Sequence, residues 1–193
     1  MKKIIFATNN NHKAKEIQQM VGNKTKIVSL KDEGINIEIE EDGATLEENA
    51  LKKAQEIYQI VKQPVFADDT GLEVEALQGD PGVNSARYSG EPKNDSRNLQ
   101  KLLSEMSNKT NRAARFRTVI CFIENDKPHF FEGIVNGKIV ETPLGLSGFG
   151  YDPVFVPDGH NVTFAEMELS LKNSISHRGK AFEKFINHIK SIS

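Results

Sequence analysis

The sequence predicts an α/β protein with a mixed sheet, folded as two lobes with a central substrate cleft. Apolar strand-like runs alternate with amphipathic helical patterns, which is typical of an α/β domain. Two long strand-like segments, 114–125 and 129–141, read as an antiparallel pair, so the sheet should be mixed. The 193 residues, 37% of them hydrophobic and 27% charged, suffice for one domain with its own core. We therefore expect a single domain over residues 1–193.

The first part of the chain predicts two strands and two helices. Residues 3–8 (KIIFAT) and 26–30 (KIVSL) read as buried strands, and residues 12–21 between them read as an amphipathic helix that ends at Gly22. Residues 45–61 give the clearest helical pattern, because apolar side chains recur at helical spacing and Thr45 with Glu48 forms a capping box.

The middle and the end of the chain predict further strands, a helix, a strand pair and a terminal helix. Residues 64–67 (PVFA) and 72–77 (LEVEAL) are predicted as strands on either side of a Thr-Gly turn. Residues 94–106 form a helix capped by Asn94 or Asp95, and the antiparallel pair turns around 126–128 (DKP). Residues 145–159 hold too many Gly and Pro residues to be regular throughout. The terminal helix, 175–192, is expected to bury one face: Ala181, Phe182, Phe185, Ile186 and Ile189.

Composition excludes some classes of function. A net charge of −2 and a pI of about 6.2 argue against a nucleic-acid polymer as partner, because such binders usually carry a basic excess. Cys121 lies in an apolar run and is expected to be an inert core residue, which fits a reducing, cytoplasmic location. The residues ahead of the polar stretch 8–13 are too few for a secretory leader, and no run is apolar enough for a membrane span.

The stretch 6–17 (FATNNNHKAKEI) is a candidate anion site. A polar loop leads from a strand into a helix, where backbone N–H groups can face an anion. Thr8, Asn9 and Asn10 would add donors and Lys13 a positive charge. The glycines of a Walker loop or of a dinucleotide fingerprint are missing, and an ordinary Asn-rich helix cap would look the same.

Carboxylates gather in two places. Glu40 and Glu41 precede Gly43, and Asp68 with Asp69 follows an apolar run where two neighbouring charges would repel each other. Hard divalent cations such as Mg²⁺ bind carboxylate oxygens and keep water or phosphate oxygens as their remaining ligands. The pattern therefore indicates a metal site, with a solvated acidic face and a charged turn as the alternative.

Two later stretches could recognise a base. Phe149 and Tyr151 lie in a glycine-rich loop ahead of Asp152, and an exposed ring there could stack on a base. His177 and Arg178 follow Ser176 at the expected start of the terminal helix and could donate to a keto oxygen. The alternatives are a loop that packs its rings into the core and a capped helix with surface charges.

Six motifs in order, taken together, carry a resemblance to a known family. The motifs TNNNHK, EENA, ADDTGLEV, PGVNSARYSG, FGYDPVF and SHRGKA are similar to those of the inosine/xanthosine triphosphate pyrophosphatase family, and the resemblance runs from about residue 3 to about residue 188. The resemblance implies Mg²⁺-dependent hydrolysis of ITP, dITP and XTP to the monophosphate and pyrophosphate, by a cytoplasmic homodimer with a two-lobed fold. By this reaction such an enzyme would remove non-standard purine nucleotides from the nucleotide pool.

The resemblance also implies roles for individual residues. Asp69 would be the catalytic base, and the metal would be held by Asp69 with one of Glu40 or Glu41. Lys53 would hold the phosphate chain, although it could equally be a solvated helix residue. The substrate-binding positions that the resemblance assigns are Thr8, Asn9, Asn10, Asn11, His12, Lys13, Thr70, Phe149, Gly150, Tyr151, Asp152, Lys172, His177 and Arg178.

Small departures from the family pattern bear on affinity and not on reaction class. They are Asn9 and His12 in the anion-binding stretch and Asn84 in the motif PGVNSARYSG. Two other functions remain open at this point: a nucleotide-binding regulator with the same pocket but no chemistry, and a pyrophosphatase for other modified nucleotides. Intact Lys13 and Asp69 favour an enzyme over a regulator.

Overall fold

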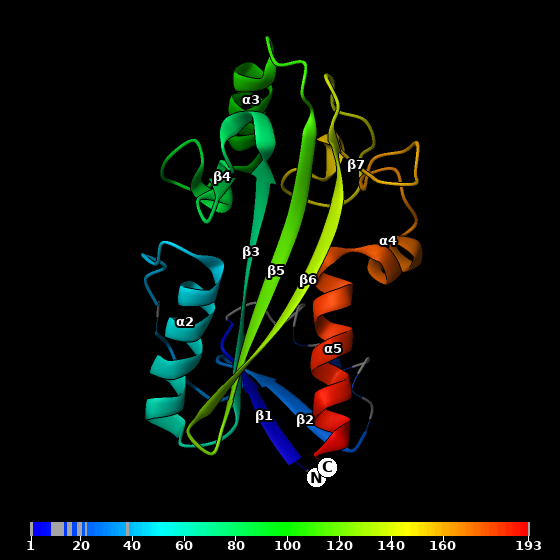
Figure 1. Ribbon diagram of the computed structural model, residues 1–193. Coiled ribbons are helices and arrows are strands. Elements are labelled where there is room, and N and C mark those ends of the chain that lie inside the picture. The colour runs from blue at the N-terminus through cyan, green and yellow to red at the C-terminus, as the bar shows by residue number, and fades with distance from the viewer. Residues whose placement is uncertain are drawn as a thin grey trace. The chain divides into compact units, whose positions relative to one another are not determined.

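The protein is a mixed α/β structure built around a seven-stranded sheet (Figure 1). The computed structural model describes residues 2–8, 14, 17–18, 21, 23–37 and 39–192. The sheet order is β2-β1-β3-β5-β6-β7, with β4 paired to β3. The strands are β1 (Lys2–Phe6), β2 (Thr25–Ser29), β3 (Val65–Val74), β4 (Pro81–Gly82), β5 (Ala113–Glu124), β6 (Lys127–Ile139) and β7 (Phe155–Pro157).

The pairing of the strands confirms the predicted mixed sheet. Strand β1 pairs in parallel with both β2 and β3, whereas β3–β4 and β6–β7 are antiparallel. The helices are α2 (Leu46–Val61), α3 (Asp95–Met106), α4 (Leu169–Ile175) and α5 (His177–Ser191), with short 3₁₀ turns at Glu75–Leu77, Ser85–Arg87 and Asp152–Val154. The predicted helix over 12–21 lies mostly outside the described residues; Ala14, Ile17, Gln18 and Val21, which are described, are helical.

The chain divides into two compact units, each with its own core. The first unit comprises Met1–Asp69, Val119–Glu132 and Ala181–Ser193, and the second comprises Thr70–Thr118 and Gly133–Lys180. That the chain forms one domain with a central cleft stays a prediction.

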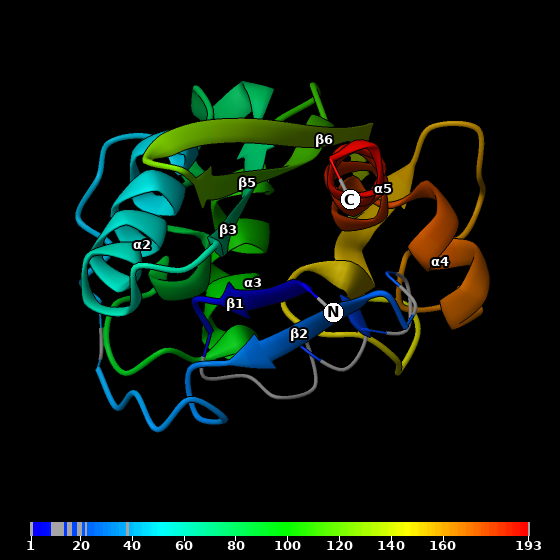
Figure 2. The same ribbon diagram turned by 90° about the horizontal axis from the view of Figure 1, so that it is seen from below.

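In the first unit, α5 buries the face that its sequence predicts. Phe182 and Phe185 pack against Phe66 with ring centroids 6.1 and 4.6 Å apart, and Phe66 stacks on Phe6 at 4.2 Å. Helix α2 lies on the opposite side of β3 from α5 (Figures 1 and 2). Both helices turn an apolar face inward, which is why their sequence periodicity identified them correctly.

The two ends of α2 are fixed locally. The Thr45 side chain accepts a hydrogen bond from the Glu48 N–H, and the Glu48 carboxylate accepts one from Thr45, which confirms the predicted capping box. Lys62 ends the helix in the left-handed conformation, with φ of 49°. A cap of this kind typically contributes about 1 kcal/mol, so the start of α2 is determined by its own sequence.

In the second unit, helices α3 and α4 contribute side chains to a core of large apolar residues. Asn94 is the N-cap of α3, since its side chain accepts from the Arg97 N–H at 2.9 Å. This resolves the alternative between Asn94 and Asp95. The core includes Leu102, Met106, Phe155 and Phe164, all at most 1% exposed. Helix α4 was not predicted, because only seven residues form it and it buries no residue fully.

The predicted turn between residues 67 and 72 is wrong. Strand β3 runs without interruption from Val65 to Val74, so Asp68 and Asp69 lie inside a strand. The Thr70 hydroxyl pairs with that of Thr118 on the neighbouring strand at 2.8 Å. The charges that suggested a turn are tolerated in the strand because a lysine from α2 lies beside them, as described below.

The predicted antiparallel pair is confirmed, with its turn slightly displaced. Strands β5 and β6 are neighbours in the sheet, and Asn125 with Asp126 forms the turn at φ of 51° and 60°. Asn and Asp accept this conformation more readily than most residues. Lys127 already belongs to β6, so the turn lies one residue earlier than the DKP motif suggested.

Candidate functional site

Two groups of predicted site residues are gathered in the structure, one in each unit. In the first unit, Glu41, Lys53, Asp68 and Asp69 form what we call the acidic cluster. The Lys53 ammonium group pairs with the Glu41 carboxylate, donates to the Asp68 carbonyl at 2.7 Å and lies 3.7 Å from Asp69 Oδ1. Helix α2 supplies the lysine, strand β3 the two aspartates and the loop before α2 the glutamate.

The acidic cluster is held by charge. Burial of Lys53 lowers its pKa, but the nearby charges of Asp69, Asp68 and Glu41 outweigh burial and raise the pKa above its ordinary value. Lys53 therefore stays an ammonium ion at neutral pH. Its side chain and that of Asp69 are each 13% exposed. Carboxylate oxygens of Glu41 and Asp69 therefore lie near the ammonium group of Lys53 and balance its positive charge.

A further residue of the acidic cluster escaped the sequence reasoning. Asn49 is 2% exposed, and its Nδ2 donates to Asp69 Oδ2 at 3.0 Å. Its signal was present in the sequence: an asparagine occupies the apolar face of an amphipathic helix, where a buried amide needs hydrogen-bond partners. The partner could not be read from the sequence, since Asp69 lies 20 residues away on another element.

In the second unit, Phe149, Asp152, Lys172, His177 and Arg178 form the aromatic–cationic cluster. Asp152 is 3% exposed, and its Oδ2 accepts from Lys172 Nζ at 2.6 Å and from the Phe149 N–H at 2.8 Å. The Phe149 ring is 60% exposed, with Lys172 Nζ 5.1 Å and Arg178 Cζ 5.4 Å from its centroid. An exposed aromatic ring thus lies close to two cations.

The loop that carries Phe149 is fixed on both sides. Gly148 has φ of 82°, and a Cβ atom there would collide with the Asp152 carboxylate, so the loop requires glycine at this position. The Gly150 N–H donates to Asp95 Oδ2 at 2.9 Å, and the Tyr151 hydroxyl donates to the Ser85 carbonyl at 2.8 Å. Tyr151 is 4% exposed and belongs to the core, so of the two rings only Phe149 is presented outward.

The start of α5 brings the remaining two residues to this cluster. His177 is 6% exposed and stacks on Phe116, with centroids 4.6 Å apart and planes 14° from parallel. Ser176 caps the helix, because its hydroxyl accepts from the Gly179 N–H at 3.0 Å. The predicted Ser176 cap is therefore confirmed, whereas His177 is buried and is not a surface charge. That His177 and Arg178 donate to a base stays a prediction.

The other predicted positions lie elsewhere or outside the described residues. Asn9, Asn10, Asn11, His12 and Lys13 fall outside the described residues. Thr8 is described, and its carbonyl accepts from the Leu30 N–H at 3.1 Å. Of the two candidate glutamates, Glu41 contacts Lys53, whereas Glu40 is exposed.

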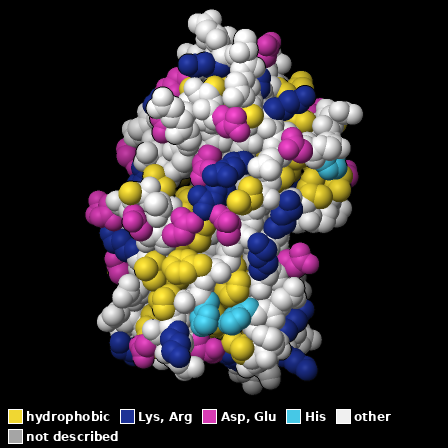
Figure 3. Space-filling view, in the orientation of Figure 1, with side chains coloured by type: hydrophobic (Ala, Val, Ile, Leu, Met, Phe, Trp, Pro, Cys, Tyr) yellow, Lys and Arg dark blue, Asp and Glu magenta, His cyan; other side chains and the backbone are white. Residues whose placement is uncertain are grey.

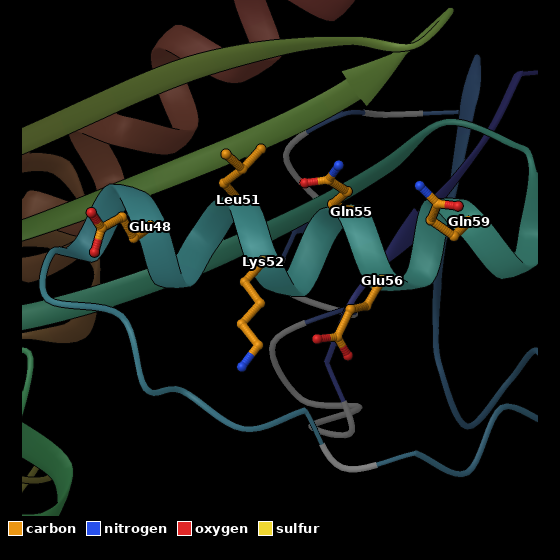
Figure 4. A pocket seen from close by; sticks show the side chains of 6 residues that line it. All are labelled: Glu48, Leu51, Lys52, Gln55, Glu56 and Gln59. Atoms are coloured by element: carbon orange, nitrogen blue, oxygen red, sulfur yellow. The ribbon is translucent and has the colours of Figure 1, made fainter.

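A surface groove of about 410 Å³ on α2 contains none of the predicted site residues among the described positions that line it. The lining side chains all come from α2 and form two rows along it (Figure 4). Leu51, Gln55 and Gln59 make up one row, and Lys52 and Glu56 belong to the other. The six lining residues are Glu48, Leu51, Lys52, Gln55, Glu56 and Gln59.

Acidic and basic side chains are interspersed on the face shown in Figure 3, and no extended basic surface is visible over its described residues. This agrees with the composition. Within the described part of the chain, no helix has the length and apolar character needed to cross a bilayer.

Known proteins resemble the chain over nearly its whole length. A dITP/XTP pyrophosphatase of Flavobacterium psychrophilum is 50% identical over 188 residues, covering 97% of this chain and 99% of that protein. One from Porphyromonas gingivalis is 51% identical and covers 94% of both chains. The structure of the Staphylococcus aureus Ham1 protein superposes with a TM-score of 0.94 at 36% identity, covering both chains fully.

The sequence model of the Ham1 family matches residues 4–188, which span both units and both clusters. The order of motifs in the sequence, the mixed α/β fold and the full-length similarity all agree. This chain belongs to the Ham1 family.

Proposed function

We propose that this protein hydrolyses non-standard purine nucleoside triphosphates, namely dITP, XTP and ITP, to the monophosphate and pyrophosphate. The observation that carries the proposal is the name of its relatives: proteins 43–51% identical to it, over nearly their whole length, are called dITP/XTP pyrophosphatases. Each cluster by itself offers groups suited to one part of such a substrate, the aromatic–cationic cluster to a purine base and the acidic cluster to phosphates.

The aromatic–cationic cluster is proposed to bind the base. The exposed face of Phe149 can stack on a purine, a contact worth roughly 1–3 kcal/mol. Lys172 uses one N–H on Asp152 and keeps further donors, and the Arg178 fork adds more. Hypoxanthine and xanthine carry a 6-keto acceptor where adenine carries a donor, so this set favours the keto bases.

The acidic cluster is proposed to act on the phosphates. Asp69 would orient a water molecule and accept its proton as the water attacks a phosphorus atom, with pyrophosphate as the leaving group. Lys53 would hold phosphate charge. Its present contacts with Glu41 and Asp69 keep its ammonium group at this position.

The acidic cluster also fits Mg²⁺, which prefers oxygen ligands and usually takes only one or two carboxylates from the protein. No group of three His, Cys, Asp or Glu residues suited to a metal occurs among the described residues. Asp69 and Glu41 provide the two carboxylates and already lie near one cation, Lys53; Glu40 is the alternative to Glu41. When bound, the ion would neutralise phosphate charge.

The same family membership supports two further proposals. We expect a cytoplasmic protein, in keeping with the buried thiol of Cys121, and a homodimer. Sedimentation velocity should give about twice the chain mass of 21.6 kDa. A species at the chain mass under assay conditions would contradict the dimer.

The decisive test is pyrophosphate release from a panel of ITP, dITP, XTP, GTP, ATP and CTP, with Mg²⁺ and with EDTA. The expected result is rapid release from the first three in Mg²⁺ and loss of release in EDTA. Binding without release would instead identify a nucleotide-binding regulator. Preference for a pyrimidine or another modified nucleotide would overturn the substrate assignment while leaving the reaction in place.

A further inference from the structure

Asn49 connects the two separate chain segments that supply carboxylates to the acidic cluster. Its Oδ1 accepts a hydrogen bond from the Gly43 N–H at 2.8 Å, and its Nδ2 donates to Asp69 Oδ2 at 3.0 Å. Gly43 lies two residues after Glu41. One amide therefore ties the loop that carries Glu41 to the strand that carries Asp69.

The contact with the loop is close enough to constrain the sequence. A Cβ atom at Gly43 would lie 2.7 Å from Asn49 Oδ1 and 2.9 Å from the Glu48 Cβ. Both distances are shorter than side chains tolerate, so the loop can approach α2 this closely only with glycine at position 43. Two side chains of α2 therefore hold the loop that brings Glu41 to Lys53: Asn49 through the Gly43 N–H, and Glu48, whose carboxylate accepts from the Ala44 N–H at 2.7 Å. Of the two, only Asn49 also contacts Asp69.

The contact with the strand assigns different partners to the two oxygens of Asp69. Asn49 donates to Oδ2, and Lys53, one helical turn further along α2, lies 3.7 Å from Oδ1. A carboxylate held through one oxygen by a buried amide has a defined orientation, because rotation about its Cβ–Cγ bond would break that hydrogen bond. Its other oxygen then faces the positively charged side of the cluster.

We propose that Asn49 is a positioning residue for the reaction: it orients the Asp69 carboxylate and holds the Glu41 loop in place. The inference rests on the proposed function, because it assigns Asp69 a catalytic and metal-binding task. Asn49 itself acts only through these two neighbours. Loss of a residue that orients a ligand typically costs ten- to a hundred-fold in metal affinity or activity.

The chain supplies a matched control in Asn98. This residue is also a buried helical asparagine, 1% exposed, and its Oδ1 accepts from the Ser89 N–H at 2.8 Å. Its Nδ2 donates to the Ala86 carbonyl at 2.9 Å and not to a carboxylate. Asn98→Ala should therefore lower the unfolding midpoint much as Asn49→Ala does, without the effect on the acidic cluster.

The experiment measures Mn²⁺ binding by electron paramagnetic resonance, together with kcat and KM for ITP. We expect Asn49→Ala to raise the Mn²⁺ dissociation constant and to lower kcat, each by about ten-fold or more, with little change in KM. Asn98→Ala should leave the Mn²⁺ dissociation constant and kcat near those of the wild type. If Asn49→Ala matches Asn98→Ala in both quantities to within about two-fold, the inference is wrong.

A second pair of variants covers the case in which Asn49→Ala does not fold. Asn49→Asp keeps the side-chain volume and the acceptor for Gly43 but replaces the donor with a charge that repels Asp69. Combining it with Asp69→Asn exchanges the two groups and restores a hydrogen bond between them. The combination should recover the unfolding midpoint lost in Asn49→Asp, yet recover neither Mn²⁺ affinity nor kcat. Normal Mn²⁺ affinity in Asn49→Asp would overturn the inference.

The design separates this inference from the proposed function. A wild-type protein that binds Mn²⁺ but releases no pyrophosphate would refute the function, and the Mn²⁺ dissociation constants of the variants would still decide the role of Asn49. Pyrophosphate release by the wild type with unchanged kcat and Mn²⁺ affinity in the Asn49 variants would refute the inference alone. A wild type that neither binds Mn²⁺ nor releases pyrophosphate would refute both.

Discussion

The ammonium group of Lys172 lies 2.6 Å from Asp152 Oδ2, in an ion pair whose two side chains are only 12% and 5% exposed. The same oxygen accepts the Phe149 N–H, so this ion pair also fixes the loop that presents the Phe149 ring. A buried pair of this kind contributes to stability chiefly because each charge needs the other: removing one leaves a buried charge without compensation.

We therefore predict that Lys172→Ala destabilises the protein by about 3–5 kcal/mol in urea unfolding and raises KM for ITP. The control is Lys52→Ala, which removes a pair with Asp42 whose side chains are 32% and 58% exposed. It should change stability little, because exposed ion pairs are screened by water and salt. Equal losses in the two variants would contradict the special role of the buried pair.

Asp69→Asn should abolish most turnover and leave the fold intact. The substitution keeps the size of the side chain and an oxygen that can accept from Asn49, but it removes the negative charge and the proton acceptor. A loss on the order of 10²-fold or more in kcat is expected for a base that also binds metal. Circular dichroism checks the fold, and near-normal turnover by a folded variant would remove Asp69 from the catalytic role.

Arg178→Ala should reduce discrimination between ITP and ATP. The Arg178 guanidinium lies 5.4 Å from the Phe149 ring centroid, where it could donate to the 6-keto oxygen of a stacked base. Loss of such a donor costs roughly 1–3 kcal/mol for the keto base, so the ratio of kcat/KM for ITP over ATP should fall about ten-fold. Lys180→Ala, two residues along the same helix, is the control, since Lys180 donates to the Ile134 carbonyl. A parallel fall for both nucleotides would place Arg178 outside base recognition.

His188 should make stability depend on pH. Burial lowers its pKa below the ordinary 6.5, and the nearby His129 lowers it further. The unfolded chain then binds the proton more readily than the folded one, so this contribution to stability is complete above pH 6.5 and is lost as pH falls below that value. His188→Phe retains a ring beside Phe122 and Phe131 and should flatten the fall in thermal midpoint between pH 7.5 and pH 5. An unchanged slope in this variant would exclude His188 as its source.

The Cys121 thiol should be inert in the folded protein. It is 0% exposed, and burial raises its pKa to about 12, so only about one molecule in ten thousand carries the reactive thiolate at pH 8. N-ethylmaleimide should leave the native protein unlabelled over an hour and label it fully in guanidinium chloride, as mass spectrometry would record. Rapid labelling of the native protein would show that strand β5 opens readily.

The sequence by itself determined the elements whose signals are local. The capping box of Thr45 and Glu48 placed the start of α2, and the helical spacing of Phe182, Phe185 and Ile189 identified the buried face of α5. Caps and periodicity act within one element, so they survive whatever surrounds them. The motifs likewise indicated which residue types gather for nucleotide chemistry, and hence the family.

The tertiary structure alone decided how the charges are accommodated. Two adjacent aspartates after an apolar run predicted a turn, because a charge buried in a strand is costly, yet β3 continues through Asp68 and Asp69. Lys53 makes this possible from α2, and the same lysine brings Glu41, not Glu40, into the cluster. Asn49 completes it through a hydrogen bond across 20 residues of sequence. The free energy of a buried charge depends on its neighbours in space, and which neighbours those are is set by the packing of α2 against the sheet.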